Sequence, residues 1–306
     1  MLFWDPLPTT DTTMSHYSAV RLYATLVCAL VLSLLAARPA RAQFTPRPLN
    51  DPATGERYHI EGAAALWFPG INLTVNSEEF GIAGSQIDFK NDLGATDHSI
   101  GDLKLVLRPT KRSKFRFEYI PIHYDATAVL KRSVIFNGIR YDVGLPVNST
   151  LDWKAYRLIY EYDVASFDRW YAGFILEAKY TDIAVKLASP VDVETAAAQA
   201  PVPSLGGVGR VYVVPNISVT AEITGMKLPE NLIKRTFAHY LDVDIYGTVN
   251  FNDHLGAQFG YRSLDVGVTV KSDVANGCST TPTAGLTGTS GCFTLRGPYI
   301  GVVARY

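Results

Sequence analysis

The chain has 306 residues, of which 47% are hydrophobic, and its 28 basic and 29 acidic side chains nearly cancel. This balance, without a basic stripe, argues against a nucleic-acid-binding protein. Beyond one N-terminal segment, no apolar run approaches the roughly 20 residues that a transmembrane helix requires.

The N-terminal segment has the organisation of an export signal. An apolar run at 22–37 is followed by ARPARA, whose last alanines form an A-x-A site before Gln43. We therefore predict a cleaved signal peptide over 1–42, with Met14 as the natural start. A periplasmic lead over 43–56 would follow. A retained anchor helix is the alternative reading of the same run.

The rest of the chain alternates between apolar and polar residues with a period of two. Leu241, Val243 and Ile245 share one face, for example, while Asp242 and Asp244 share the other. Such alternation predicts strands with one apolar face. We predict ten of them, at 58–68, 98–109, 113–126, 149–163, 169–186, 206–214, 216–227, 236–251, 254–271 and 293–306.

Short and long connections alternate between these strands. The short ones are 108–113, 163–168, 215–216 and 252–253, and the long ones are 69–97, 127–148, 187–205, 228–235 and 272–292. Outer-membrane barrels have short periplasmic turns and long outer loops. The predicted fold is therefore an all-β, antiparallel, up-and-down transmembrane β-barrel over 57–306. Ten strands fit best, with eight or twelve as alternatives, and a soluble sandwich or lipocalin-like barrel is the competing fold.

Three predicted strands change the phase of their alternation after a tyrosine. Tyr119, Tyr180 and Tyr261 each end an aromatic-rich apolar face, and an aliphatic residue follows three positions later in the opposite phase. A β-bulge produces such a one-residue slip. We expect these tyrosines to lie at the outer interface of the membrane, with a β-bulge after each of them. Relaxed patterning beyond the bilayer is the alternative.

Opposite charges recur on the polar strand faces. In a ten-stranded barrel they would face a narrow lumen, pair across it and close it. The predicted lumen charges are Glu61, Lys104, Arg108, Arg116, Glu118, Arg157, Glu161, Glu177, Lys179, Arg210, Glu222, Asp242, Asp244 and Arg262. This pattern disfavours a wide diffusion pore but leaves a narrow or gated channel for small solutes open.

The C-terminal strand carries the most specific motif. Its pattern of polar-x-Gly-x-x-apolar-x-aromatic is filled by Tyr299, Gly301, Ala304 and Tyr306. With this motif the chain resembles the small single-chain outer-membrane β-barrel proteins of Gram-negative bacteria. The resemblance implies that the last strand is an assembly signal read by the barrel assembly machinery, with periplasmic chaperones as earlier partners.

Few residues suggest chemistry. His123 and Asp125 share one face of the third strand and could activate water, which makes them weak catalytic candidates for a lipid-modifying enzyme. A satisfied hydrogen-bond network at the rim is the alternative. Cys278 and Cys292, an even pair in an exported chain, predict a disulfide. No metal-ligand cluster is apparent, and we expect no metal or cofactor.

The favoured function is a structural or surface-binding barrel of the bacterial outer membrane. It would act as a monomer in contact with membrane lipid and lipopolysaccharide. A hairpin predicted at 132–146, around Asn137-Gly138, would project above the membrane and carry surface contacts. A lipid-modifying enzyme and a narrow channel are the alternatives.

Overall fold

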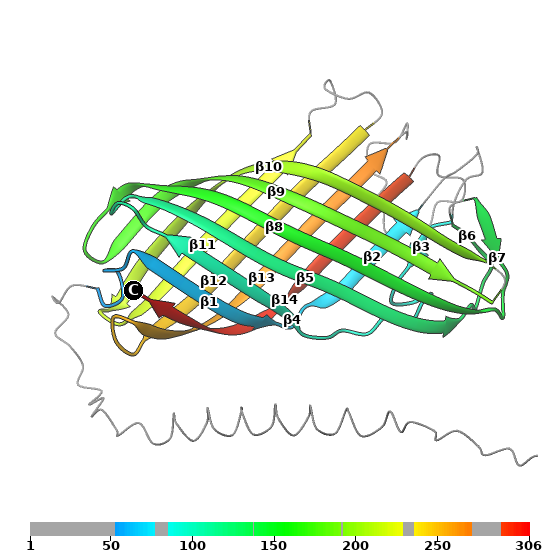
Figure 1. Cartoon of the computed structure of the whole chain (residues 1–306), viewed down its shortest axis with the longest axis horizontal. Coiled ribbons are helices and arrows are strands. Elements are labelled where there is room, and N and C mark those ends of the chain that lie inside the picture. Colours follow the sequence, from blue (N-terminus) through cyan, green and yellow to red (C-terminus); the bar gives the residue numbers. More distant parts are fainter. Residues whose placement is uncertain (1–52, 77–84, 137, 191, 229–235, 271–288) are drawn as a thin grey trace, which may run out of the picture. The chain divides into compact units, whose positions relative to one another are not determined.

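Ten antiparallel strands close into a single barrel in the computed structural model (Figure 1). The structure describes residues 53–76, 85–136, 138–190, 192–228, 236–270 and 289–306. Within these ranges, no helix is long and apolar enough to cross a membrane. We call the end of the barrel with the short turns and Tyr306 the inner end, and the opposite end the outer end.

Ten of the fourteen described strands match the ten predicted segments, although several are longer. The described strands are β1 (Ile60–Trp67), β2 (Gly70–Asn76), β3 (Ile87–Asp88), β4 (Ile100–Leu107), β5 (Ser113–Val129), β6 (Val134–Phe136), β7 (Ile139–Tyr141), β8 (Pro146–Ser166), β9 (Trp170–Ala188), β10 (Val193–Val214), β11 (Ile217–Lys227), β12 (Thr236–Asn250), β13 (Leu255–Val270) and β14 (Thr289–Arg305). The strands at 70–76 and 87–88 lie in the predicted loop 69–97, and those at 134–136 and 139–141 form the predicted hairpin. The prediction of an all-β, ten-stranded antiparallel barrel is confirmed.

The first and last strands close the barrel. β1 pairs with the inner half of β14, and β2 pairs with the outer half of the same strand. β1 and β2 therefore act as one barrel strand, interrupted at Phe68 and Pro69. Proline cannot donate to a strand ladder, so it suits this interruption. The other edge of β1 pairs with β4, so both edges of β1 are paired.

The outward faces of the strands are apolar around the inner part of the barrel. On β4, Leu103, Leu105 and Leu107 are 55%, 44% and 45% exposed, although leucine is usually buried in soluble proteins. An apolar band of this kind covers the wall of a membrane barrel. The alternation therefore points apolar side chains away from the lumen, as the transmembrane reading requires.

The predicted bulges after Tyr119, Tyr180 and Tyr261 are wrong. The register of β5 with β8 is continuous from Ser113 to Val129, and those of β9 and β13 with their neighbours are unbroken at the tyrosines. Tyr180 and Tyr261 do face outward. Beyond the tyrosines the interior becomes apolar and the outward face polar, because an outer wall beyond the bilayer would meet water. A change of environment, with no change of backbone, explains the phase change.

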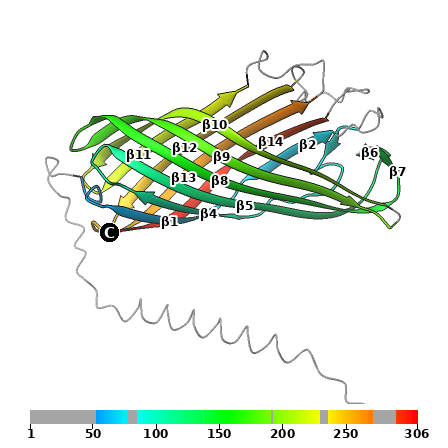
Figure 2. The ribbon, with the colours of Figure 1, turned by 45° about the horizontal axis from the view of Figure 1, so that its top comes forward.

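The segment 187–205, predicted as a long loop, is mostly strand. β9 runs to Ala188 and β10 starts at Val193, so only four residues connect them. Pairing of β10 with β11 begins at Leu205, and none of the described residues pairs with the preceding part of β10 on that side. That part is therefore an edge strand, where Pro201 and Pro203 are tolerated. Figure 2 shows β5, β8, β9 and β10 extending together beyond β11, β12, β13 and β14.

An apolar cluster fills the outer half of the barrel. Its buried members include Trp67, Leu73, Ile122, Leu151, Trp153 and Phe293, and we call it the outer apolar cluster. The predicted hairpin is present as β6 and β7, with Gly138 at a φ of 79° in its turn. However, it does not stand free above the barrel. Its side chains Val134, Phe136 and Tyr141 are buried in the same cluster, so the hairpin caps the outer end.

Candidate functional site

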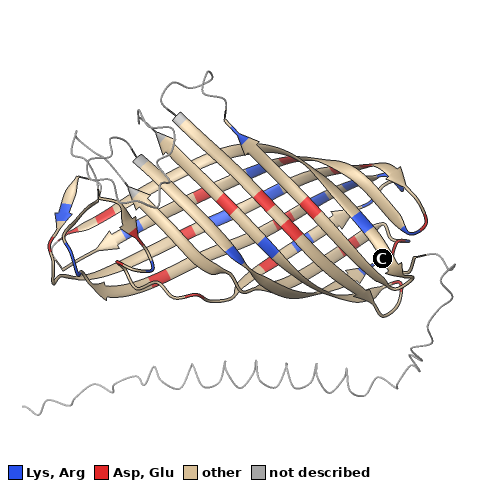
Figure 3. Ribbon diagram, turned by 180° about the vertical axis from the view of Figure 1, so that it is seen from behind, with Lys and Arg blue, Asp and Glu red and all other residues tan. Residues whose placement is uncertain are grey.

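Charged side chains fill the inner half of the lumen. Figure 3 shows acidic and basic residues on neighbouring strands through the middle of the barrel. At the centre, Arg262 Nη1 lies 2.7 Å from Glu118 Oε1, and Arg262 Nη2 lies 2.7 Å from Asp242 Oδ2. Arg157 Nη1 lies 3.0 Å from Glu118 Oε2. Arg157 also pairs with Glu177. The predicted lumen residues in this group thus form one connected network.

A second group of ion pairs lies closer to the inner end. Lys114 Nζ is 2.6 Å from Glu161 and 3.1 Å from Asp163, and all three side chains are buried. Arg116 is 2.7 Å from Glu222 on β11. The Lys114 pairs join the adjacent strands β5 and β8, whereas the Arg116–Glu222 pair joins β5 to β11 across the lumen and so braces the barrel wall.

The remaining predicted lumen residues also point inward. Glu61 bonds Arg305 at the seam, Lys179 is 2.7 Å from Glu177, and Asp244 accepts a hydrogen bond of 3.0 Å from Tyr299. Lys104 borders two cavities of about 10 Å³ each. A cavity of that size holds about one water molecule, so neither amounts to a passage.

The inner mouth is closed by residues 53–59, which we call the N-terminal latch. Glu56 accepts hydrogen bonds from Arg210 at 2.9 Å, from Arg108 at 3.0 Å and from the Tyr212 hydroxyl at 2.6 Å. The backbone of Thr54 bonds Pro215 at 2.7 Å. The last residues of the predicted periplasmic lead therefore belong to the barrel.

Glycine is required at one position of the latch. Gly55 has a φ of 83°, and a Cβ atom there would lie 2.7 Å from a guanidinium nitrogen of Arg305. Any other residue would have a strained backbone at this positive φ, and its Cβ atom would clash with Arg305. The Arg305 side chain also bonds Glu61. The backbone N–H of Gly55 donates to Asp253 at 3.0 Å. This tight fit ties the latch to the β12–β13 turn.

Neutralising Glu56 should destabilise the barrel, and the effect should depend on pH. Burial alone would raise the pKa of Glu56, but Arg210 and Arg108 outweigh it and lower this pKa to about 2 from 4.5. The ionised carboxylate therefore stabilises the fold above about pH 4.5, and this contribution is lost as the pH falls toward 2. We expect Glu56→Gln to lower the free energy of unfolding at pH 7 by about 1.5–3 kcal/mol, measured by urea unfolding.

The difference between wild type and Glu56→Gln should shrink when the measurement is repeated at pH 3. Asp168→Asn, which removes an exposed carboxylate from the β8–β9 turn, is the matched control and should change stability by less than about 0.5 kcal/mol. A pH-independent difference would show that the charge of Glu56 does not hold the latch.

The weak catalytic candidates lie on the outer wall and face away from the lumen. His123 Nδ1 is 2.6 Å from Asp152, and Nε2 is 2.7 Å from Asp125, with all three side chains exposed. The hydrogen bonds to Asp152 and then Asp125 raise the pKa of His123. Both ring nitrogens of His123 lie within hydrogen-bond distance of a carboxylate. This arrangement matches the predicted rim network, and a catalytic role of His123 and Asp125 stays a prediction.

The C-terminal motif residues occupy distinct environments. Tyr299 faces the lumen, and a Cβ atom at Gly301 would lie 2.8 Å from Ala64 and Ala65 on β1, so this position needs glycine. Ala304 and Tyr306 face outward. Their role as an assembly signal stays a prediction. The predicted disulfide also stays one, because Cys278 lies outside the described residues.

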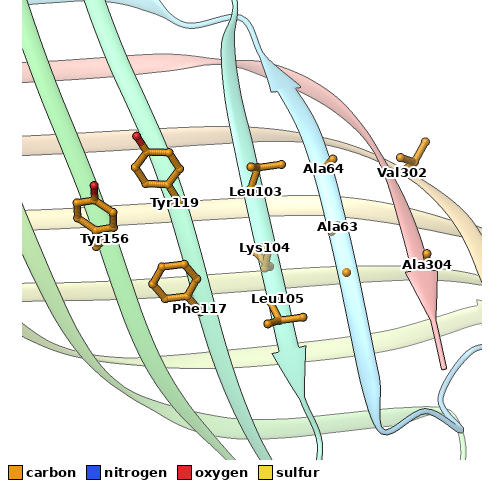
Figure 4. A pocket seen from close by; sticks show the side chains of 11 residues that line it. Ala63, Ala64, Leu103, Lys104, Leu105, Phe117, Tyr119, Tyr156, Val302 and Ala304 are labelled. Atoms are coloured by element: carbon orange, nitrogen blue, oxygen red, sulfur yellow. The ribbon is translucent and has the colours of Figure 1, made fainter. Parts of the chain in front are cut away.

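A broad concavity lies on the outward-facing surface of the barrel wall. It has a volume of about 730 Å³ and spans β14, β1, β4, β5 and β8 (Figure 4). Its floor is low because Gly62, Ala64 and Ala304 have little or no side chain. We call it the wall groove.

Comparison with known proteins supports the fold. No family model and no curated protein matches the sequence. The solved structure of the outer-membrane protease OmpT from Escherichia coli matches with a TM-score of 0.51 and 8% identity, over 84% of this chain and 100% of that chain. The chain has the outer-membrane β-barrel fold. At 8% identity, the likeness does not extend to protease activity.

Two further solved structures resemble this outer-membrane barrel more distantly. The toluene transporter TodX from Pseudomonas putida has 9% identity, and the translocator domain of the autotransporter NalP from Neisseria meningitidis has 12%. Each reaches a TM-score of 0.36 and covers 84% of this chain, with 93% and 91% of their own chains matched. Scores this low support no argument about function.

Sequence reasoning missed several members of the lumen network. Asp102 and Lys114 fall in phase with the predicted inward residues, so the alternation itself could have found them. Asp163 sits beside a register shift at the end of β8, where the phase is unreliable. Glu56 precedes the first alternating segment, and no local pattern marks it.

Proposed function

We propose that this protein is a closed, non-conducting barrel of the bacterial outer membrane that works through its outward-facing wall and surface. It is exported by a cleaved signal peptide, acts as a monomer and has membrane lipid as its main partner. The fold it shares with OmpT supports the location. The observation that carries the proposal is the filling of the lumen.

Three successive layers occupy the interior from one end to the other. The N-terminal latch covers the inner mouth, the ion-pair network fills the inner half, and the outer apolar cluster with its hairpin fills the outer half. A hydrated ion would have to displace several buried ion pairs and then cross apolar side chains. Both steps carry a high desolvation cost. This order of layers argues against the narrow-channel alternative.

Planar-bilayer recording tests the proposal. We expect no discrete conductance steps from the folded wild-type barrel, whose insertion is verified in the same preparation by its heat-modifiable mobility on gels. A general porin reconstituted in parallel serves as the positive control. Regular conductance steps from the wild type, absent from bilayers without protein, would contradict a closed lumen.

A further inference from the structure

The wall groove is an open space that the barrel backbone does not require. Gly62 on its floor has no positive φ, and a Cβ atom there would meet nothing within 4 Å. A larger apolar residue would therefore fit, as at Leu103 and Leu105 on the neighbouring strand. Because the floor positions have little or no side chain, the wall forms a concave apolar surface at the level of the apolar band.

One end of the groove is polar. The rings of Tyr119 and Tyr156 stack with centroids 5.0 Å apart, and Figure 4 shows both hydroxyls pointing toward the outer end of the barrel. Lys154 faces outward two residues beyond Tyr156, or about 7 Å further along β8. Neither hydroxyl nor the ammonium group is bonded to any described residue.

We propose that the wall groove binds an outer-leaflet lipid of the lipid A class. Its acyl chains would lie on the groove, and a phosphate would accept hydrogen bonds from Lys154 and the two tyrosine hydroxyls. An apolar surface with three unpaired donors at its outer end matches an amphipathic anion in one orientation only. The groove spans five strands, which gives width for more than one chain. The inference rests on the proposed function, in which the wall makes the contacts.

The charge next to Lys154 sharpens the test. Asp182 lies directly opposite Lys154 in the β8–β9 register, and no ion pair joins them. Its carboxylate would repel a phosphate bound at Lys154. Removing this charge should therefore strengthen binding, whereas removing the Lys154 charge should weaken it.

Native mass spectrometry of the delipidated full-length barrel, titrated with lipid A or phosphatidylglycerol, measures the binding. We expect one lipid A to bind more tightly than phosphatidylglycerol. Gly62→Leu, which fills the groove floor, should weaken lipid A binding roughly tenfold. Gly101→Leu is the matched control, because Gly101 is another outward-facing glycine with open space at its Cβ but does not line the groove. It should bind like wild type.

The charge variants add a second readout. Lys154→Gln should weaken lipid A binding about two- to fivefold, and Asp182→Asn should strengthen it by a similar factor. Equal binding by Gly62→Leu and Gly101→Leu would overturn the proposal. A dimer that Gly62→Leu dissociates would assign the groove to a second copy and overturn it as well. A conducting barrel would refute the closed-lumen function without affecting these titrations, so the two failures are distinguishable.

Discussion

Replacing Arg262 with glutamine should lower the free energy of unfolding by about 3–5 kcal/mol, the range seen when one partner of a buried ion pair is removed. The Arg262 guanidinium bonds Asp242 through two nitrogens at 2.7 and 3.1 Å, and it also contacts Glu118 at 2.7 Å and Asp102 at 3.2 Å. Glutamine would leave these carboxylates close together without their shared cation. Urea unfolding of the refolded barrel, followed by gel mobility, measures the change.

Two further variants separate charge from geometry at this position. Arg262→Lys keeps the charge but cannot donate two parallel hydrogen bonds to Asp242, so it should recover only part of the loss. Arg140→Gln breaks an exposed pair with Asp142 and should change stability by less than about 1 kcal/mol. If Arg262→Gln unfolds at the same urea concentration as Arg140→Gln, the central network does not hold the barrel together.

Deleting Tyr306 should weaken closure of the barrel, whereas Tyr306→Ala should not. The Tyr306 backbone donates to Ile60 at 2.8 Å and accepts from His59 at 2.7 Å and from Ile60 at 2.9 Å. Losing three hydrogen bonds should cost about 1.5–4.5 kcal/mol. The side chain is 86% exposed, so its removal should leave stability in detergent nearly unchanged. Urea unfolding of both variants in detergent measures the difference.

The same two variants test the predicted assembly signal in cells. If the Tyr306 side chain is read during assembly, Tyr306→Ala should reach the outer membrane at a reduced level despite normal refolding in detergent. Cell fractionation with an antibody against the barrel provides this measurement. Normal outer-membrane levels of both variants would refute a role of Tyr306 in assembly, and equal urea midpoints of both variants would refute its role in closure.

The fold was predictable because the alternation reports which environment each strand face meets. Leu103, Leu105 and Leu107 identified an outward apolar face, and Glu118 and Arg262 identified an inward charged one. The same logic failed beyond Tyr119, where the two environments exchange. A polarity pattern cannot distinguish a slip of the backbone from a change of surroundings. Only the continuous pairing of β5 with β8 decides between them.

Other features could not be read from local sequence because they depend on distant partners. The outer part of β10 is an edge strand because β11 pairs with β10 only from Leu205 onward. The Ala- and Pro-rich sequence of this part does not indicate where that pairing stops. Glu56 finds Arg210, 154 residues away, only after the barrel has formed. The wall groove likewise results from small residues on β1 and β14, which the register places side by side.

The N-terminal latch has a consequence for the order of folding. Glu56 accepts hydrogen bonds from Arg108, which follows β4, and from Arg210 on β10. The nearby Thr54 forms hydrogen bonds through its backbone with Pro215 and Asn250. None of these groups is in position until the sheet has closed, and such distant contacts form late. Docking of the latch must therefore be a terminal step. Protection of its backbone amides from hydrogen exchange would report completed barrels and distinguish them from partly assembled ones.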